Sequence, residues 1–346
     1  MSIPTSGLQF RDPRIEMAHG AGGKASRRLV EGLFAPLLLQ SSPGPLGDAA
    51  HVGVNGSRIA ITADSFVVRP LRFPGGSIGE LAVNGTVNDL AVSGAKAEAL
   101  VVTWVLEAGL ASDDLEAEVR AMARAAELAG VAIAGGDTKV VEHGKADGMY
   151  ITTAGFGRPI PGVQIDPHSV QPGDKVLLSG PIGDHGITIL LARGELDIEA
   201  DLRSDTRSVL PLVEALAAAA GRGIRWMRDP TRGGVATSLN ELARDSGAGI
   251  HVFEECVPIR DAVRGACELL GFDPLHIANE GQFLAVVAAE QADAALATLR
   301  KAPGGSAAAI IGEIRRDPPG MVLGSTGYGG TRVIDMLVGD PLPRIC

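Results

Sequence analysis

The chain has 346 residues, of which 45% are hydrophobic, 21% charged and 3% aromatic, and its formal net charge is −10. This length supports two domains with separate cores. The negative charge repels phosphate backbones, and few rings are present to stack on bases, which argues against nucleic-acid binding. No apolar run approaches the roughly 20 residues that span a bilayer, and no basic-then-apolar leader is visible. We therefore expect a cytoplasmic protein with no membrane or nucleic-acid partner.

The first half of the chain alternates strand-like and helix-like runs after a segment rich in Gly and Pro. That segment covers residues 1–45 and contains one expected helix at 25–39. An N-terminal domain is expected over residues 46–160. Its expected strands are 59–62, 99–106, 131–134 and 149–155, and its expected helices are 77–93 and 112–129. Alternating strands and helices indicate an α/β or α+β layered fold.

A Pro-dense stretch at 157–173 has no hydrophobic period and marks a domain boundary. A C-terminal α/β domain is expected over residues 170–338, followed by a mobile tail at 339–346. Three cysteines do not make a disulfide framework, so Cys256 and Cys267 are expected to be reduced core residues. The expected strands of this domain are 175–179, 283–288 and 307–314, and its expected helices are 187–193, 208–220, 234–246, 261–270 and 291–301.

The chain ends in a cysteine, Cys346. A thiol on a terminal tail can be swung into a pocket as a tethered carrier, and the thiolate is its reactive form. The neighbouring Arg344 would lower the pKa of this thiol, whereas the α-carboxylate would raise it. The alternative is a frayed terminus that happens to end in cysteine.

Three acidic residues lie beside Gly, Asn or Thr at the ends of apolar runs: Asp64, Asp89 and Asp137. If they point into one cleft, their mutual repulsion requires a cation, and Mg²⁺ with nucleotide phosphates is the usual solution. The alternative is turn chemistry, which favours Asp beside Gly or Asn without any metal. Three such residues in one domain favour a metal–phosphate site.

Gly-rich loops precede several expected helices. The segment His19-Gly20-Ala21-Gly22-Gly23-Lys24 offers backbone amides and Lys24 to an anion, but it lacks the spacing of a Walker A loop. The segments at 179–186 and 229–234 are equally consistent with phosphate cradles and with tight strand-to-helix turns. Glu280 follows Asn279 at a turn, where a solvated glutamate is the plain alternative to a functional carboxylate.

In chain order these segments resemble the HypE family of hydrogenase maturation factors. That family belongs to the ATP-binding superfamily of aminoimidazole ribonucleotide synthetase, thiamine monophosphate kinase and selenophosphate synthetase. Three departures from the family pattern are Ala63, Ser77 and Gln282, and Gln282 leaves one positive contact in doubt. The matching segments are HGAGGK, TADSFVV, FPGGSIGELAVNGTVNDLAVSGA, GGDTKVV, GDHG, MRDPTRGGVATSLNE, IANEG and PRIC.

The resemblance implies an ATP-dependent dehydration. A HypF-type carbamoyltransferase would place a carbamoyl group on the sulfur of Cys346. ATP would then phosphorylate the carbamoyl oxygen, and loss of phosphate and the N–H protons would leave a thiocyanate. The cyano group would pass through a HypC–HypD complex to the iron of a [NiFe]-hydrogenase. The implied fold is a two-domain synthetase-like chain whose N-terminal sheets pair into a barrel across a homodimer.

The resemblance also implies roles for individual residues. Cys346 is the expected carrier and Glu280 the expected base, with Lys139 the third expected catalytic residue. The expected metal ligands are Asp64, Asp89 and Asp137, which would hold Mg²⁺. The expected ATP-binding residues are Lys24, Asp64, Asn88, Asp89, Asp137, Thr138 and Asp229. Two alternatives stay open: a small-molecule kinase or synthetase of the same superfamily, and a non-enzymatic scaffold that docks partners through its tail.

Overall fold

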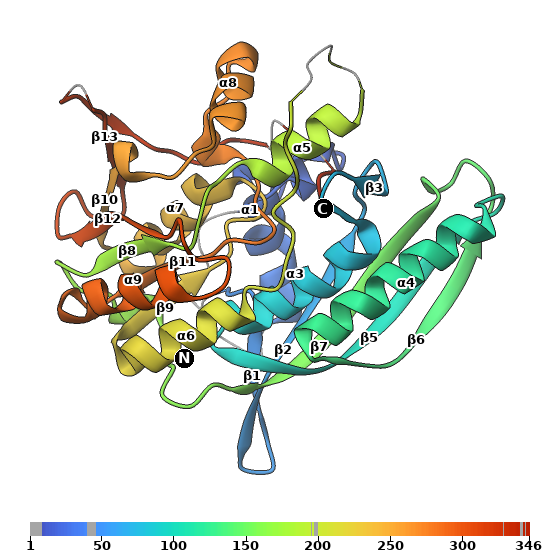
Figure 1. Cartoon of the computed structure of the whole chain (residues 1–346), viewed down its shortest axis with the longest axis horizontal. Helices are drawn as coiled ribbons and strands as arrows, with labels where there is room; N and C mark the ends of the chain where they lie inside the picture. Colours follow the sequence, from blue (N-terminus) through green and yellow to red (C-terminus); the bar gives the residue numbers. More distant parts are fainter. Residues whose placement is uncertain are drawn as a thin grey trace.

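The computed structural model of the chain describes residues 9–39, 46–194, 196, 200–327, 329–339, 342 and 344–346. The remainder of the expected N-terminal segment and tail residues 340, 341 and 343 lie outside the described residues. Two mixed sheets, each covered by helices, form the molecule (Figure 1). The expected mixed α/β fold is confirmed.

The first sheet has the strand order β1-β2-β7-β5-β6. Adjacent strands of this sheet are antiparallel, except β5 and β6, which are parallel. A parallel pair needs a crossover connection, which α4 provides between β5 and β6. The strands are β1 (Ala50–Val54), β2 (Ser57–Phe66), β5 (Ala95–Glu107), β6 (Ala132–Val141) and β7 (Met149–Pro159), with a separate small pair β3 (Arg72–Phe73) and β4 (Gly76–Ser77).

Two helices cover one face of this sheet (Figure 1). They are α3 (Ile78–Val92) and α4 (Ser112–Ala129), which pack against each other. Nearly every side chain of α3 is buried, and Leu90 is 0% exposed. Helix α4 ends where Gly130 adopts the left-handed conformation at φ 66°, which glycine takes without steric cost. Burial of these helices against β2, β5 and β7 forms the core of the N-terminal half.

The opposite face of the first sheet is open. Strand β6 is exposed along almost its whole length, and β1 along all of it. The exposed large apolar residues on this face are Val52, Val54, Ile61, Val101 and Phe156, whereas Ile133 and Val140 of β6 lie on the other face. No closed barrel occurs within the described part of the chain, so this face is uncovered in the single chain.

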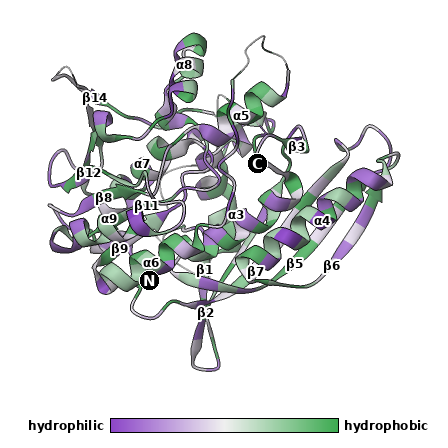
Figure 2. Ribbon diagram, in the orientation of Figure 1, coloured by the Kyte–Doolittle hydropathy of each residue, from purple (hydrophilic) through white to green (hydrophobic). Residues whose placement is uncertain are grey.

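The second sheet has the strand order β14-β13-β10-β12-β8-β11-β9. Helix α7 contributes to the core cluster on one face of this sheet. Helices α6 and α9 pack against each other in the core cluster on the opposite face. Figure 2 colours most of α6 as hydrophobic, as its burial requires. The strands are β8 (Lys175–Leu178), β9 (Ile224–Arg228), β10 (Gly249–Phe253), β11 (Leu284–Val287), β12 (Ala309–Arg315), β13 (Val322–Ser325) and β14 (Thr331–Val333), and the helices are α5 (Asp184–Ala192), α6 (Leu210–Ala220), α7 (Gly234–Ser246), α8 (Asp261–Leu270) and α9 (Ala292–Lys301).

A buried amide joins the two halves. Asn88 on α3 is 1% exposed, and its Nδ2 donates to the carbonyls of Arg207 and Glu280 at 2.9 and 3.0 Å. Its Oδ1 accepts from the Val209 amide at 2.8 Å. Because a buried amide is costly unless its groups are paired, Asn88 fixes the C-terminal half against α3.

The N-terminal helical segment is continuous but not uniform. It consists of α1 (Lys24–Leu29), a π-helical turn η2 (Val30–Phe34) and α2 (Ala35–Leu38), where a single helix was predicted. A segment near the C-terminus packs beside its start, because the amides of Lys24 and Ala25 donate to the carbonyls of Leu337 and Val338 at 2.9 and 3.1 Å. The first and last parts of the chain therefore meet.

One core assignment was wrong. Cys267 is buried at 1% exposure, as predicted, but Cys256 is exposed. Strand β10 ends at Phe253, and Cys256 lies in the 3₁₀ turn that follows, so it does not share the strand's buried face. Among the described helices, none combines the length and apolar character that a membrane crossing requires.

The burial of α3 gives a stability prediction. We expect Leu90→Ala to lower the free energy of unfolding by about 2–5 kcal/mol, because it removes buried methyl groups and leaves a cavity. Chemical denaturation followed by circular dichroism measures this. Leu128→Ala on α4 is the matched control, since Leu128 is 88% exposed and its loss should cost less than about 0.5 kcal/mol. Equal effects of both substitutions would contradict the assigned core.

Candidate active site

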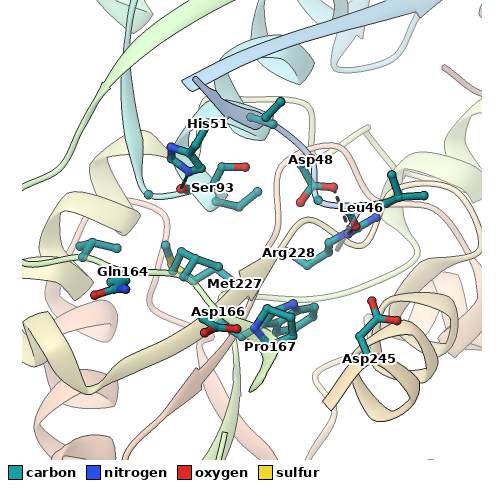
Figure 3. Close-up of a pocket in the computed structure, with 18 of the residues that line it drawn as sticks. Leu46, Asp48, His51, Ser93, Gln164, Asp166, Pro167, Met227, Arg228 and Asp245 are labelled. Carbon is teal, nitrogen blue, oxygen red and sulfur yellow. Dashed lines mark hydrogen bonds and ion pairs between the residues drawn. The ribbon is translucent and has the colours of Figure 1, made fainter. Parts of the chain in front are cut away.

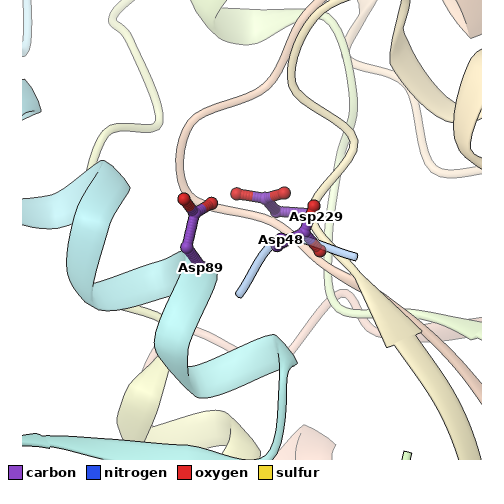
Figure 4. A group of neighbouring side chains, drawn as sticks. All are labelled: Asp48, Asp89 and Asp229. Atoms are coloured by element: carbon purple, nitrogen blue, oxygen red, sulfur yellow. The ribbon is translucent and has the colours of Figure 1, made fainter. Parts of the chain in front are cut away.

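Three carboxylates from distant parts of the chain meet between the two halves (Figure 4). Asp48 lies just before β1, Asp89 lies on α3, and Asp229 directly follows β9. One oxygen of each lies within 4.8 Å of the others. The Thr62 hydroxyl lies 3.0 Å from Asp89 Oδ2 and 2.7 Å from the Asp48 carbonyl, so β2 supports the cluster.

Burial and mutual repulsion shape the electrostatics of this cluster. The pKa of Asp48 is raised to about 6, first by burial and further by Glu241 and Asp64, although Arg228 opposes the shift. Burial and then neighbouring carboxylates raise the pKa of Asp89 and of Asp229 well above its ordinary value. Such a cluster is destabilised when ionised and stabilised by a cation placed between its oxygens.

Arg228 supplies part of the compensating charge. Its Nε donates to Asp48 Oδ1 at 2.8 Å, and its terminal nitrogen lies 3.0 Å from Glu241 Oε2. The same guanidinium also donates to the Leu46 carbonyl at 3.3 Å. Arg228 therefore holds one oxygen of Asp48 and fixes the segment before β1 against α7.

A cavity of about 370 Å³ opens beside the cluster. Besides the three aspartates, Asp64 and Glu280 line it. Glu280 is 3% exposed and its Oε1 has no hydrogen-bond partner among the described residues, so the solvated-turn alternative for this glutamate is wrong. Burial and then Asp229 raise the pKa of Glu280 well above its ordinary value. An unpaired buried carboxylate oxygen beside three others forms a donor set that suits a hard divalent cation such as Mg²⁺.

A larger cavity of about 750 Å³ lies on the other side of the segment before β1 (Figure 3). Asp48 and Arg228 line both cavities, so the residues around Gly47 form part of a shared wall. The larger cavity also contains His51, whose Nε2 lies 3.2 Å from the Ser93 carbonyl at the end of α3.

The Gly-rich loop before α1 borders the smaller cavity through Gly22 and Gly23. Its amides do not all face that cavity, because the Lys24 amide pairs with Leu337. The Lys24 ammonium lies 2.6 Å from Asp335 Oδ2. Lys24 therefore contacts the C-terminal segment in this structure.

Asp137, Thr138 and Lys139 lie apart from the carboxylate cluster within one chain. The register across the sheet runs from Asp64 on β2 through Thr153 and Val102 to Gly136 on β6. Strand β6 is therefore three strands from β2, which is roughly 14 Å at the usual strand spacing.

Residues adjacent along a strand point to opposite faces, so Asp137 lies on the open face of the sheet while Asp64 lies on the helix-covered face. Asp137 is exposed, and its hydrogen bond to Lys139 at 2.6 Å is the main reason its pKa is lowered.

The C-terminal tail is docked between the two halves. The Val67 amide donates to the Cys346 carbonyl at 2.9 Å, and Ile345 is 2% exposed. Arg344 forms an ion pair with Asp147 and donates to the Val67 carbonyl at 3.2 Å. Arg344 is thus engaged away from the thiol whose pKa it was expected to lower.

His185 on α5 holds the docked tail. Its Nε2 lies 2.6 Å from the Ile345 carbonyl and its Nδ1 lies 2.8 Å from the Ser204 hydroxyl. Burial lowers the pKa of His185 to about 4, so the ring is neutral near pH 7. A neutral ring that meets a carbonyl at Nε2 carries its proton there, and Nδ1 then accepts from Ser204.

The sequence alone identified Asp89, Asp229, Asp64 and Glu280 around this cavity, but it missed Asp48. The available signal was Gly47-Asp48 before a short β-branched run, and that run was not recognised as β1. Asn88 was expected at the nucleotide, yet its side-chain amide is used between the halves.

Comparison with known families defines the class of protein. Residues 46–158 match the N-terminal domain of AIR synthase related protein, and residues 171–323 match the C-terminal domain. Together these matches cover most of the chain, and they contain the first sheet and most of the second.

Full-length relatives specify the family. The chain is 48% identical over 341 residues to the carbamoyl dehydratase HypE of Azotobacter vinelandii, which covers 99% of this chain and 100% of that protein. A solved HypE–HypF complex superposes with a TM-score of 0.84 at 42% identity, over 89% of this chain and 99% of that one. A HypE structure in complex with ATP superposes with a TM-score of 0.80 at 44% identity, over 96% of this chain and 100% of that one. The chain belongs to the HypE family of carbamoyl dehydratases.

The crowded carboxylates give a prediction for the metal-free protein. In EDTA at pH 8 we expect Asp89→Asn to raise Tm by a few degrees, because it removes one of three repelling charges; about 1 kcal/mol shifts Tm by roughly 2–4 °C at this size. A carboxyl whose pKa is higher in the folded state than in the unfolded state makes the protein less stable as pH rises. For Asp48 this stability is lost between pH 3.8 and about 6. The gain should therefore shrink at pH 4.

Differential scanning calorimetry measures this gain. The control for loss of one charge is Glu127→Gln, because Glu127 is an exposed residue of α4. Mg²⁺ should raise the Tm of the wild type more than that of Asp89→Asn. A Tm of Asp89→Asn that is lower than wild type at pH 8 would contradict the electrostatic assignment.

Proposed function

We propose that this chain is an ATP-dependent S-carbamoyl dehydratase that converts a carbamoyl group on Cys346 into a thiocyanate for the cyanide ligands of a [NiFe]-hydrogenase. The observation that supports this most directly is the docked tail. Hydrogen bonds from the Val67 amide and the His185 ring to backbone carbonyls hold the terminal residues beside an acidic cavity. A thiol carrier needs such a bound position during dehydration, since water would otherwise compete for the activated intermediate.

The carboxylate cluster fits the phosphoryl-transfer half of this reaction. Asp48, Asp89 and Asp229 would hold Mg²⁺, with Asp64 and Glu280 adjoining them. The ion would neutralise charge on the nucleotide phosphates during transfer. Asp64, Asp89 and Asp229 were among the expected metal ligands or nucleotide contacts. Glu280 was expected as the base instead, and Asp48 was not predicted.

Glu280 is the proposed base for the carbamoyl N–H. Its burial and its unpaired Oε1 leave it free to take a proton, and a carboxyl with a raised pKa is a better proton acceptor near neutral pH. The backbone around Glu280 is fixed, because its amide donates to Asp205 and its carbonyl accepts from Asn88.

We further propose a homodimer in which the open sheet faces pair into a barrel. The exposed apolar residues that β1, β2, β5 and β7 place on this face support this, because contiguous apolar surface favours association. Thr138 lies on the opposite face of β6, whereas Asp137 and Lys139 lie on the open face, so pairing would carry these two residues towards the partner's cavity. They would then act in ATP binding there, with Lys139 near the reacting group.

The remaining partners follow from the same proposal. A HypF-type carbamoyltransferase would load Cys346, and a HypC–HypD complex would receive the cyano group. We also propose a cytoplasmic location for these reactions. The chain requires ATP and Mg²⁺ as cofactors in this scheme, with Lys24 as a further phosphate contact once it leaves Asp335.

The first test follows the mass of the C-terminal peptide. After incubation with the carbamoyltransferase, carbamoyl phosphate and Mg-ATP, we expect gain of a carbamoyl group and then loss of one water. Cys346→Ala should show neither change while Tm stays within a degree or so, and Cys256→Ala is the matched control because Cys256 is also an accessible thiol. ATP hydrolysis without any change at Cys346 would favour a small-molecule kinase, and absence of ATP binding would favour a scaffold.

The second test asks whether one site uses two chains. Asp89→Asn and Lys139→Met should each be inactive alone, since each lacks one half of every site. Mixing the two variants under conditions that exchange subunits should restore part of the activity, because a mixed dimer contains one intact site. A monomer mass by light scattering, or no recovery on mixing despite demonstrated exchange, would contradict the shared site.

A further inference from the structure

The smaller cavity is lined by four arginines, and three of them are engaged by carboxylates. Arg27 pairs with Glu31 at 2.7 Å, Arg228 pairs with Asp48, and Arg244 pairs with Glu31 at 2.9 Å. The fourth is Arg232. Within the described part of the chain it forms no ion pair, and its hydrogen bond runs from a terminal nitrogen to the Gly20 carbonyl at 3.3 Å.

Arg232 is nevertheless surrounded by negative charge. Its pKa is raised first by the charge of Cys346 and then by Asp64 and Glu280, against the effect of burial. The guanidinium lines the cavity together with Asp64 and Glu280, and the charge of Cys346 also acts on it. A cation in that position is available to an anion that enters the cavity.

The backbone of Arg232 is held in place from two sides. A Cβ on Gly22 would lie 2.5 Å from Arg232 Cβ, so the Gly-rich loop packs directly against this residue. On the other side, the Asn279 amide and Nδ2 both donate to the Pro230 carbonyl at 3.0 Å. The turn that carries Arg232 is thus fixed to the segment that carries Glu280.

We propose that Arg232 is a catalytic residue that binds the phosphoryl group as it passes from ATP to the carbamoyl oxygen on Cys346. This inference rests on the proposed function. A guanidinium presents a planar fork of donors that matches two phosphate oxygens, and its charge offsets the negative charge that spreads over the transferred group.

The reaction that Arg232 would assist converts the carbamoyl group and ATP into a thiocyanate, ADP and inorganic phosphate. The carbamoyl oxygen attacks the γ-phosphorus, the bond from that phosphorus to the bridging oxygen breaks, and ADP leaves while one N–H proton is lost. The C–O bond then breaks with loss of the second N–H proton, which leaves S–C≡N and inorganic phosphate. One proton stays on the phosphate and the other goes to solvent. Arg232 would contact the phosphate oxygens through both steps.

The test compares Arg232→Gln and Arg232→Lys with Arg120→Gln, a control that removes an exposed arginine from α4. Each protein is first carbamoylated on Cys346 and then mixed with Mg-ATP in a single turnover. We expect Arg232→Gln to slow ADP formation by about 10³-fold, the low end for a transition-state arginine. Its affinity for Mg-AMPPNP should change less than about threefold, and its affinity for ADP–aluminium fluoride should fall by about the same factor as the rate.

Two further measurements separate this role from a structural one. Millimolar methylguanidine should partly restore the rate of Arg232→Gly, and Arg232→Lys should recover less than that, since it lacks the fork. Thiol-reagent labelling of Cys346 should not accelerate in Arg232→Gln, since loss of a nearby cation disfavours the thiolate. If labelling accelerates and the rate of carbamoylation falls equally, Arg232 docks the tail carboxylate and the proposal is overturned.

Failure of the proposed function is recognised separately. In that case wild-type protein carbamoylated on Cys346 would not lose water when Mg-ATP is added. If the wild type reacts and Arg232→Gln keeps both its rate and its affinity for ADP–aluminium fluoride, only the role of Arg232 is refuted.

Discussion

The arrangement of the molecule depends on one unfavourable contact, the approach of Asp48, Asp89 and Asp229 within 4.8 Å of one another. These residues come from the segment before β1, from α3 and from the end of β9, so the cluster forms only when the two halves are docked. Arg228 offsets part of the repulsion by pairing with Asp48. Buried Asn88 and the packed core keep the two halves docked against the remaining repulsion. This repulsion lowers the stability of the metal-free protein, and a bound cation would restore it.

The same docking positions the tail. The C-terminal segment first contacts the Gly-rich loop through Leu337 and Val338, and the terminal residues then pair with Val67 between the halves. Neutral His185 donates to the Ile345 carbonyl and Arg344 binds Asp147, so neither of these contacts uses the sulfur of Cys346. A carrier residue can therefore be modified on its sulfur while the hydrogen bonds that bind the tail stay unchanged.

Much of this could be predicted from the sequence, and the exceptions have physical reasons. Helices such as α3 and α4 were predicted because hydrophobic period and turn signals are local. Strand β1 was missed because its alternation is short and its residues are exposed, and Asp48 was missed with it. Cys256 was misplaced because one turn of 3₁₀ helix ends the strand early, which no apolar pattern records. The joining role of Asn88 depends on residues more than a hundred positions away.

Asp137 illustrates a constraint that no local pattern reveals. It resembles Asp64 in its sequence surroundings, since both follow a β-branched or small-residue run. Yet strand alternation places the two carboxylates on opposite faces of one sheet, and Lys139 forms an ion pair with Asp137. Residues on opposite faces of a sheet cannot share a ligand in one subunit. If both act on the same nucleotide, the sheet must present Asp137 to a second copy, so the open face and the acidic cavity belong to one functional design.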